Sequence, residues 1–301
     1  WSLELSRAVT DRAVFHLDNA YYIPNVEFSG RVAKTNLASN TAFRGFGGPQ
    51  GMLVIEEIMD RIARVTGLAP EVVRQRNLYR ERGETNTTPY GQEIEDNRLQ
   101  RIWRELIESS DFAARHQELQ DWNAQQPNKK RGLAITPVKF GISFTTTHLN
   151  QAGALVLLYQ DGTAQVNHGG TEMDQGVYSN IALIAARELG LTSDRVRVMA
   201  TRTDKVPNTS ATAASCGTDL NGAAVKNACD TLRARLLPFA EAMLSAKSGA
   251  AVPIGRVVFN DNLVVNVDDP QSACRLAELL QRAYFARPRL SATGLYGAPA
   301  A

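Results

Sequence analysis

Hydrophobic positions in the first half of the chain recur mostly with the period of an α-helix. Between residues 52 and 65, apolar side chains fall at 52, 55, 58, 59, 62 and 65, the spacing of one helical face. Acidic residues lie early in this segment and basic residues late, an order that complements the helix dipole. The pattern predicts a helix here and further helices over about 70–79, 96–109 and 111–124.

Strands and helices alternate in the second half, whereas residues 1–40 read as rich in strands and loops. Because the two kinds of element interleave, we expect an α+β fold with two mixed helix/strand subdomains. The polar, basic segment 125–132 is broken by Pro and Gly, so we expect domains at 1–127 and 128–301. The elements predicted beyond that boundary are strands at 133–144 and 196–200, hairpins at 154–167 and 259–267, and helices at 177–189, 219–246 and 272–284.

Composition narrows the class of protein. Hydrophobic residues make up 44% and charged residues 21% of the 301 residues, as in ordinary soluble globular proteins. The formal net charge of +2 gives no reason to expect nucleic acid or a membrane as a partner. Cys216, Cys229 and Cys274 are widely spaced and form no Cys-x-x-Cys pair, which argues against a structural zinc or an iron–sulfur site in this chain. We therefore expect a cytoplasmic protein.

Three loops of small residues each lead into a predicted helix. The first, residues 43–50, contains three glycines, one arginine and two phenylalanines; the others are residues 168–176 and 208–218. The unpaired N–H groups and the dipole at a helix start attract anions. Each loop alone reads as an ordinary helix cap, but together they indicate one large, polar, anionic ligand. None matches a P-loop or the Rossmann glycine fingerprint.

Several single residues remain open to more than one interpretation. Arg12 lies in an otherwise apolar stretch and is either a surface residue or a buried guanidinium directed at a ligand. By default Phe144 reads as a core residue and Thr145 as a strand residue. The four histidines show no metal-ligand spacing, and the carboxylates form no recognisable hydrolase pair.

Taken together, these segments resemble the molybdenum-binding part of the xanthine dehydrogenase family of molybdenum hydroxylases. The matching motifs span most of residues 1–225 in the order of the family, and the long ones are highly specific. They are Arg-Ala-Val-Phe-His-Leu-Asp-Asn at 12–19, the stretch 35–50 that contains Phe-Arg-Gly-Phe-Gly-Gly-Pro-Gln, residues 139–145 with 150–153, Gly-Gly-Thr-Glu-Met at 169–173, and residues 207–210 with 212–215.

The resemblance implies a molybdenum–molybdopterin cofactor and oxygen insertion from water at a purine C–H, converting hypoxanthine and xanthine to urate. It implies that Phe46 and Phe144 sandwich the flat substrate, that Thr145 bonds the purine edge, and that Arg12 pairs with a purine oxygen. Arg44 and the backbone of Ala214 would lie at the molybdenum centre. The residues implied to line the cofactor and its phosphates are Gly45, Met173, Gln175, Gly176, Thr212, Ala213 and Ser215.

The chain departs from the family pattern at some positions. Asp174 stands where the family usually has glycine, which puts a carboxylate near the phosphates, and Cys216-Gly217 puts one hydroxyl contact in doubt. The family's catalytic base, a glutamate in a Gly-Glu-Pro-Pro context, does not occur in residues 294–301. We therefore expect an incomplete chain, inactive alone, that oligomerises when intact. Its partners would be the rest of the molybdenum domain and segments or subunits carrying iron–sulfur clusters and FAD.

Three other functions stay open at this point. An aldehyde oxidase-type hydroxylase fragment would share the fold, but that group usually has an apolar residue in place of Arg12. A non-catalytic binding or assembly module of the same lineage would suit Asp174 and the missing base. An unrelated nucleotide-binding α+β domain requires the long motif matches to be coincidence.

Overall fold

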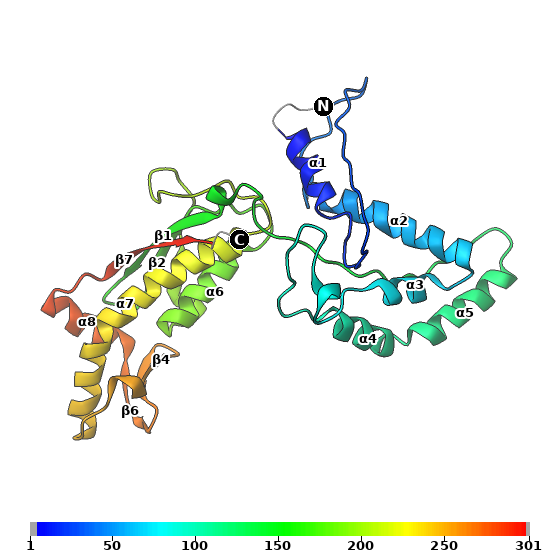
Figure 1. Ribbon diagram of the computed structural model, residues 1–301. Coiled ribbons are helices and arrows are strands. Elements are labelled where there is room, and N and C mark those ends of the chain that lie inside the picture. Colours follow the sequence, from blue (N-terminus) through cyan, green and yellow to red (C-terminus); the bar gives the residue numbers. More distant parts are fainter. Residues whose placement is uncertain (1–4, 299–301) are drawn as a thin grey trace. The chain divides into compact units, whose positions relative to one another are not determined.

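The computed structural model describes residues 5–298, and the chain divides after Gly141 into two compact units. The first unit is helical. The second combines helices with one mixed sheet and one antiparallel sheet (Figure 1). This mixture confirms the predicted α+β class. The division falls after residue 141 because residues 133–141 pack on the first unit, whereas the boundary expected from composition was at 127/128.

The first unit is built around the amphipathic α2, which is flanked by Gly47 and Gly67, both with left-handed backbone. Its apolar residues Ile55, Met59 and Ala63 are buried, and they form one core with Tyr21 and Trp103. The helices predicted from periodicity are all present. Their bounds are α2 Gly48–Thr66, α3 Pro70–Asn77, α4 Leu99–Ser109 and α5 Phe112–Gln125, with a short 3-10 turn η1 at Glu84–Asn86.

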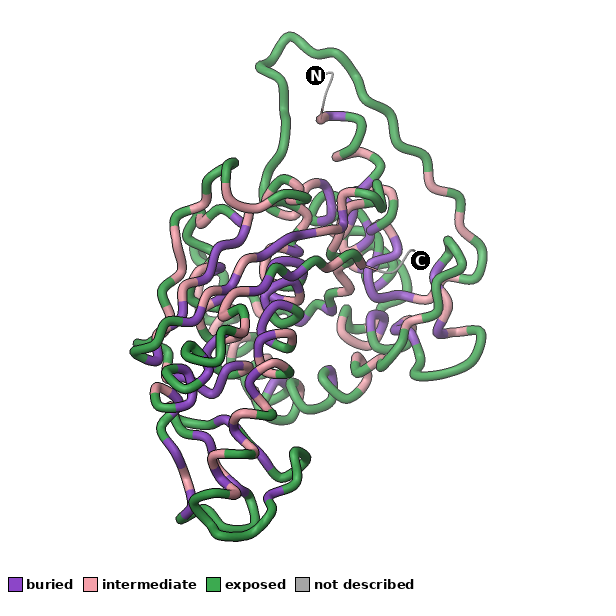
Figure 2. The backbone as a smooth tube through the Cα atoms, turned by 90° about the vertical axis from the view of Figure 1, so that its left-hand side faces the viewer, coloured by how far each residue is buried: buried purple, intermediate pink, exposed green. Residues whose placement is uncertain are grey.

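The segment before α2 differs from the expectation of strands and loops. Residues Ser6–Val14 form a helix, α1, whose last turn carries Arg12. The apolar run at 12–17 follows neither the helix period nor the strand period clearly. Packing of α1 on α2 stabilises the helix. Gly51 makes that packing possible, since a Cβ there would lie 2.2 Å from the carbonyl oxygen of Ala13. Residues 24–44 follow as an irregular segment, exposed along most of its length (Figure 2).

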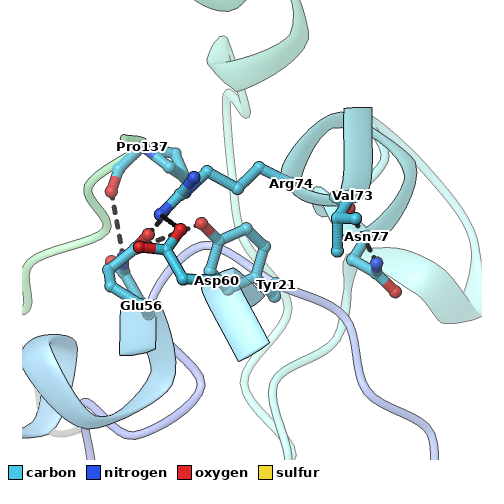
Figure 3. A network of polar contacts seen from close by, with 8 residues as sticks. Tyr21, Glu56, Asp60, Val73, Arg74, Asn77 and Pro137 are labelled. Carbon is cyan, nitrogen blue, oxygen red and sulfur yellow. Dashed lines mark hydrogen bonds and ion pairs between the residues drawn. The ribbon is translucent and has the colours of Figure 1, made fainter. Parts of the chain in front are cut away.

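A buried ion-pair network joins α2 to α3. The Arg74 guanidinium donates to Glu56 at 2.7 Å and to Asp60 at 2.8 Å, and its side chain is almost fully buried (Figure 3). The Tyr21 hydroxyl donates to the same Glu56 carboxylate at 2.7 Å. Burial together with the Glu56 carboxylate raises the pKa of Tyr21, so the phenol stays protonated and remains a donor.

Side chains of residues 12–19 hold the segment 137–141. The strand predicted over 133–144 does not form. Asn19 donates to the Pro137 carbonyl at 2.9 Å and accepts the Lys139 N–H at 3.1 Å. The Lys139 ammonium pairs with the buried carboxylate of Asp18. Side chains, and not a neighbouring strand, bond the backbone groups of this segment. Its apolar pattern therefore resembles that of a strand, although no strand forms.

The second unit has a four-stranded sheet in the order β3-β2-β1-β7 and a three-stranded sheet in the order β4-β5-β6. The predicted hairpin turns at Asp161-Gly162, where β1 pairs antiparallel with β2, while β2 and β3 are parallel. The strand bounds are β1 Gln151–Leu158, β2 Ala164–His168, β3 Val196–Val198, β4 Val257–Asn260, β5 Leu263–Asn266, β6 Asp269–Arg275 and β7 Ser291–Gly297.

Helix α7 forms the centre of this unit and packs against β7, β1 and α6 (Figure 1). Residues 272–275 belong to β6 and not to the predicted helix at 272–284, because they pair with β5 before α8 begins. The remaining predicted helices and the second hairpin are confirmed. The helix bounds are α6 Val177–Leu189, α7 Gly217–Ser248 and α8 Leu276–Ala286, with 3-10 turns η2 Thr147–Leu149, η3 Ser193–Arg195 and η4 Ile254–Arg256.

Candidate functional site

The site residues expected from the sequence are divided between the two units. The first unit carries Arg12, Arg44, Gly45 and Phe46. The second carries the remaining substrate and cofactor candidates, which are Phe144, Thr145, Met173, Gln175, Gly176, Thr212, Ala213, Ala214 and Ser215.

Arg12 is buried and is not a surface residue. The residue is 7% exposed, and its guanidinium carbon lies 5.3 Å from the centre of the Phe140 ring. The guanidinium also donates to the Gly141 carbonyl. A cation held on an aromatic face and a carbonyl has a fixed direction, as a ligand contact requires. Phe140 was not singled out from the sequence, although it lies inside one of the matching motifs.

The loop before α2 has an unusual backbone and lies against the same ring. Gly45, Phe46 and Gly47 have φ angles of 92°, 53° and 108°, in the left-handed region. A Cβ on Gly48 would lie 2.7 Å from the Phe140 ring edge, so only glycine allows this approach. Arg44 is exposed at the tip of the loop and Phe46 is half-buried. The first unit thus gathers this loop and Arg12 around Phe140.

In the second unit the loops 168–176 and 208–218 are in direct contact. The Thr171 N–H donates to the Thr212 hydroxyl at 2.8 Å. The Ser143 N–H donates to the Ala214 carbonyl at 2.9 Å, which brings the start of the 142–145 segment to the second loop. The structure therefore joins Thr212 and Ala214 to the loop of Met173. Phe144 next to this contact is half-buried, and Thr145 is exposed.

Non-glycine residues with left-handed backbone are concentrated in these loops. Asp174, Asn208, Ala214 and Ser215 have φ angles of 65°, 59°, 58° and 58°. Each such residue costs on the order of 1–2 kcal/mol, least for Asp and Asn. Strain of this kind clusters at ligand-binding sites, where the loop shape serves the ligand. Ala214 and Ser215 are consecutive, and neither side chain would help to stabilise this conformation.

The loop 172–176 is braced by its own side chains. The Gln175 side chain donates to the Thr171 carbonyl at 2.8 Å and accepts the Met173 N–H. Glu172 accepts the N–H groups of Gly176 and Tyr178, both at 2.9 Å, and these bonds lower the pKa of its carboxyl. This cap could not be recognised from the sequence. Glu172 therefore occupies N–H groups at the start of α6 that would otherwise be available to an anion.

A cluster of buried polar atoms belongs to the two loops and to the start of α7. His168 Nε2, Thr209 Oγ1 and Asn221 Oδ1 are buried and have no hydrogen-bond partner within residues 5–298. They surround Gly169-Gly170: a Cβ on Gly169 would lie 2.1 Å from Thr209 Oγ1, and one on Gly170 3.0 Å from Asn221 Nδ2. Buried polar atoms without partners are rare in finished structures. The cluster therefore fits a large polar cofactor whose groups, or whose ordered water, complete these bonds.

His168 in this cluster is a neutral imidazole. The Gly170 N–H donates to Nδ1 at 3.0 Å, so the ring proton is on Nε2. Burial lowers the pKa of His168 to about 4. In the sequence, this histidine is the first residue of a loop and one of four histidines without metal-ligand spacing, and spacing alone does not reveal its burial.

Residues 5–298 lack two other kinds of feature. No group of three or more His, Cys, Asp or Glu side chains is arranged to hold a metal ion. Within the same residues no helix combines the length and the apolar character needed to cross a membrane.

Comparison with known proteins gives the family. Two models described as molybdopterin cofactor-binding domains match residues 1–78 and 105–301. Xanthine dehydrogenase/oxidase of Mus musculus is 50% identical over 238 residues, which are 79% of this chain and 18% of that protein. Xanthine dehydrogenase of Drosophila subobscura is 42% identical over 299 residues, 99% of this chain and 20% of that protein. The chain thus spans about a fifth of these relatives.

Solved structures share the fold. Quinoline 2-oxidoreductase from Pseudomonas putida 86 superposes with a TM-score of 0.78 at 25% identity, covering 99% of this chain and 38% of that one. The aldehyde oxidoreductase from Desulfovibrio desulfuricans superposes with a TM-score of 0.65 at 22% identity, covering 98% and 28%. Since the longer family model alone spans more than half of the chain, this protein belongs to the family of molybdopterin cofactor-binding domains.

Proposed function

We propose that this chain is the cofactor-binding portion of a xanthine dehydrogenase-type hydroxylase that acts on hypoxanthine and xanthine. The observation that carries the proposal is the contact between loops 168–176 and 208–218, together with a buried cluster of unpartnered polar atoms. Backbone strain at Ala214 and Ser215 supports it, because a bound ligand would explain a conformation that the side chains disfavour.

The cofactor would be held mainly by the second unit. Thr212, Ala213 and Ser215 would offer hydroxyl and N–H groups to the pterin and its phosphates. Met173, Gln175 and Gly176 would line the other side, with the Gln175 amide exchanging its bonds within the loop for bonds to the pterin. When bound, the cofactor supplies the insertion of a water-derived oxygen at a C–H bond and accepts two electrons. From the first unit, Gly45 would contribute backbone to the cofactor and Arg44 a cation near the metal.

Substrate recognition would depend on a fixed cation and aromatic faces. Arg12 would pair with a purine oxygen and stabilise negative charge that develops there. Its contacts with Phe140 and Gly141 hold it in one orientation before substrate binds. Phe46 and Phe144 would pack on the flat purine and Thr145 would bond its edge. No residue of this chain is proposed as the catalytic base.

The partners would be other segments or subunits. Iron–sulfur clusters and FAD would carry the two electrons onward, and the remaining molybdenum-binding residues, including the base, would complete the pocket. We expect the complete enzyme to be a cytoplasmic oligomer.

Substitution of Arg12 tests the substrate class. In the complete enzyme, Arg12→Met should lower kcat/KM for xanthine by at least about 100-fold, because loss of a fixed charged donor costs about 3 kcal/mol. Arg7→Met on the same helix, at an exposed arginine, is the matched control and should keep its activity. Unchanged xanthine turnover in Arg12→Met, normalised to molybdenum content, would overturn the purine assignment.

An aldehyde substrate is the second candidate, because the aldehyde oxidoreductase shares the fold of this chain. A neutral aldehyde would gain little binding energy from a contact with a buried arginine. Comparing xanthine with an aromatic aldehyde on the wild-type enzyme separates the two: a preference for the aldehyde would favour this alternative.

A further inference from the structure

The imidazole of His16 bridges the two segments that hold Arg12. His16 is buried, one helical turn after Arg12, and its Nδ1 lies 2.8 Å from the Arg12 carbonyl oxygen. The Gly141 N–H donates to His16 Nε2 at 3.0 Å. The Gly141 carbonyl in turn accepts the Arg12 guanidinium. These three contacts close a ring, called the His16 bridge below, that contains the backbone and the side chain of Arg12.

The hydrogen bonds define one tautomer of this histidine. Since the Gly141 N–H donates to Nε2, that nitrogen carries no proton, and Nδ1 must donate to the Arg12 carbonyl. A charged imidazolium would lose the bond from Gly141 because both nitrogens would be donors. Burial lowers the pKa of His16, and the hydrogen bond to the Arg12 carbonyl raises it. The nearby cations Arg12 and Lys139 lower it further, the Asp18 carboxylate raises it, and the net shift is downward. The neutral form that the bridge needs is therefore the stable one near neutral pH.

Contacts other than His16 hold residues 137–139 of this segment in place. Asn19 holds Pro137 and Lys139, and Asp18 pairs with the Lys139 ammonium. His16 adds a contact to the end of this segment, where it holds Gly141. The Phe140 ring lies 5.0 Å from the imidazole, between centroids, so the bridge also sets the ring on which Arg12 rests.

We propose that His16 is a positioning residue for the substrate-binding arginine. His16 bonds both the Arg12 carbonyl and the Gly141 N–H and so fixes the position of Gly141. The Gly141 carbonyl then orients the Arg12 guanidinium toward a purine oxygen. The inference rests on the proposed function of Arg12. An arginine side chain loses rotamer entropy when it is held in one orientation, so an anchor that orients it in advance strengthens its contact with substrate.

The test compares two substrates, because a merely structural role would affect both alike. Xanthine carries the oxygens that Arg12 would recognise, and unsubstituted purine carries none. In the complete enzyme, normalised to molybdenum, we expect His16→Ala to lower the ratio of kcat/KM for xanthine to kcat/KM for purine about tenfold, chiefly through KM for xanthine. His16→Gln, whose amide oxygen can accept the Gly141 N–H, should restore the ratio to within about threefold. Val14→Ala, at the end of α1, is the packing control and should leave the ratio unchanged.

Arg12→Met in the same series separates failure of this inference from failure of the proposed function. If Arg12→Met lowers the ratio and His16→Ala does not, the positioning role is wrong and the function stands. If Arg12→Met leaves the ratio unchanged, the proposed role of Arg12 is wrong, and the inference about His16 falls with it. Equal losses on both substrates in His16→Ala, without rescue by glutamine, would show a structural role only and overturn the proposal.

Discussion

Single residues in the second unit adopt conformations that their side chains disfavour. Ala214 has a φ of 58° and accepts the Ser143 N–H, so the strain is held in place by a tertiary contact. Ala213 next to it has no left-handed φ. The two neighbouring alanines therefore allow a paired test of the strain.

A β-branched residue tolerates a left-handed φ worse than alanine does. We predict that Ala214→Val lowers the free energy of unfolding by about 1–2 kcal/mol, measured by urea denaturation. Ala213→Val, one residue earlier and exposed, should change it by less than about 0.5 kcal/mol. Equal effects of the two variants would contradict the strain assigned to Ala214.

The buried His168 makes stability depend on pH. Its folded-state pKa is lowered to about 4, below the unfolded value near 6.5, so the unfolded chain binds more protons between these values. This contribution is complete above about pH 6.5 and is lost as the pH falls toward 4, amounting to about 3 kcal/mol. Urea denaturation from pH 7.5 to 4.5 should show the loss, and His168→Gln should flatten the profile. The same slope in both proteins would contradict the burial of a neutral imidazole.

At the scale of elements, glycines decide how closely helix and strand approach. A Cβ on Gly294 in β7 would lie 1.9 Å from the Ala224 carbonyl oxygen of α7, whereas one on Gly297 in the same strand meets nothing within 4 Å. We predict that Gly294→Ala lowers the free energy of unfolding by about 2 kcal/mol through overpacking. Gly297→Ala should be neutral to within about 0.5 kcal/mol. Tolerance of Gly294→Ala would mean that α7 does not pack on β7 this closely.

Elements with a strong period were predictable from the sequence, and elements defined by tertiary partners were not. Helix α2 was recognisable because its buried positions repeat over nineteen residues between two glycines. Helix α1 is short and has no acidic first turn, so nothing local marks it as helical. Segment 137–141 carries a strand-like pattern, but side chains of residues 12–19 take the place of a partner strand.

The same division holds for the candidate site. The small-residue loops were visible because their composition is unusual at helix starts. The polar cluster around Gly169-Gly170 and the His16 bridge were not visible, because burial and pairing across more than 40 residues leave no local signal. Spacing also could not show that Glu172 caps α6.

At the scale of the molecule, one stripe of the exposed side of α2 is apolar, next to the exposed charged residues Glu57, Arg61 and Arg64. The inner face of α2 is buried in the core, while Val54, Ile58, Ile62 and Val65 are 50%, 43%, 40% and 87% exposed. A helix that is apolar on two faces normally has a partner on each.

We predict that the isolated chain self-associates through this face of α2 and that the double variant Ile58→Lys/Ile62→Lys is monomeric. Sedimentation velocity over a concentration series measures this. Ile254→Lys, which removes a single exposed apolar residue of the second unit, is the control and should associate like the wild type. A wild-type chain that stays monomeric and binds no hydrophobic dye would contradict the prediction.

The most direct test of the account is the molybdenum and pterin content of the complete enzyme, purified from cells that make the cofactor. We predict about one molybdenum and one pterin for each copy of this chain. The variant Thr212→Val should lose most of both, since it removes the hydroxyl that joins the two cofactor loops, while Thr192→Val, in the same unit but away from these loops, should retain them. Wild-type enzyme without molybdenum or pterin, or a Thr212→Val variant with full content, would contradict the claim that these loops form the cofactor site.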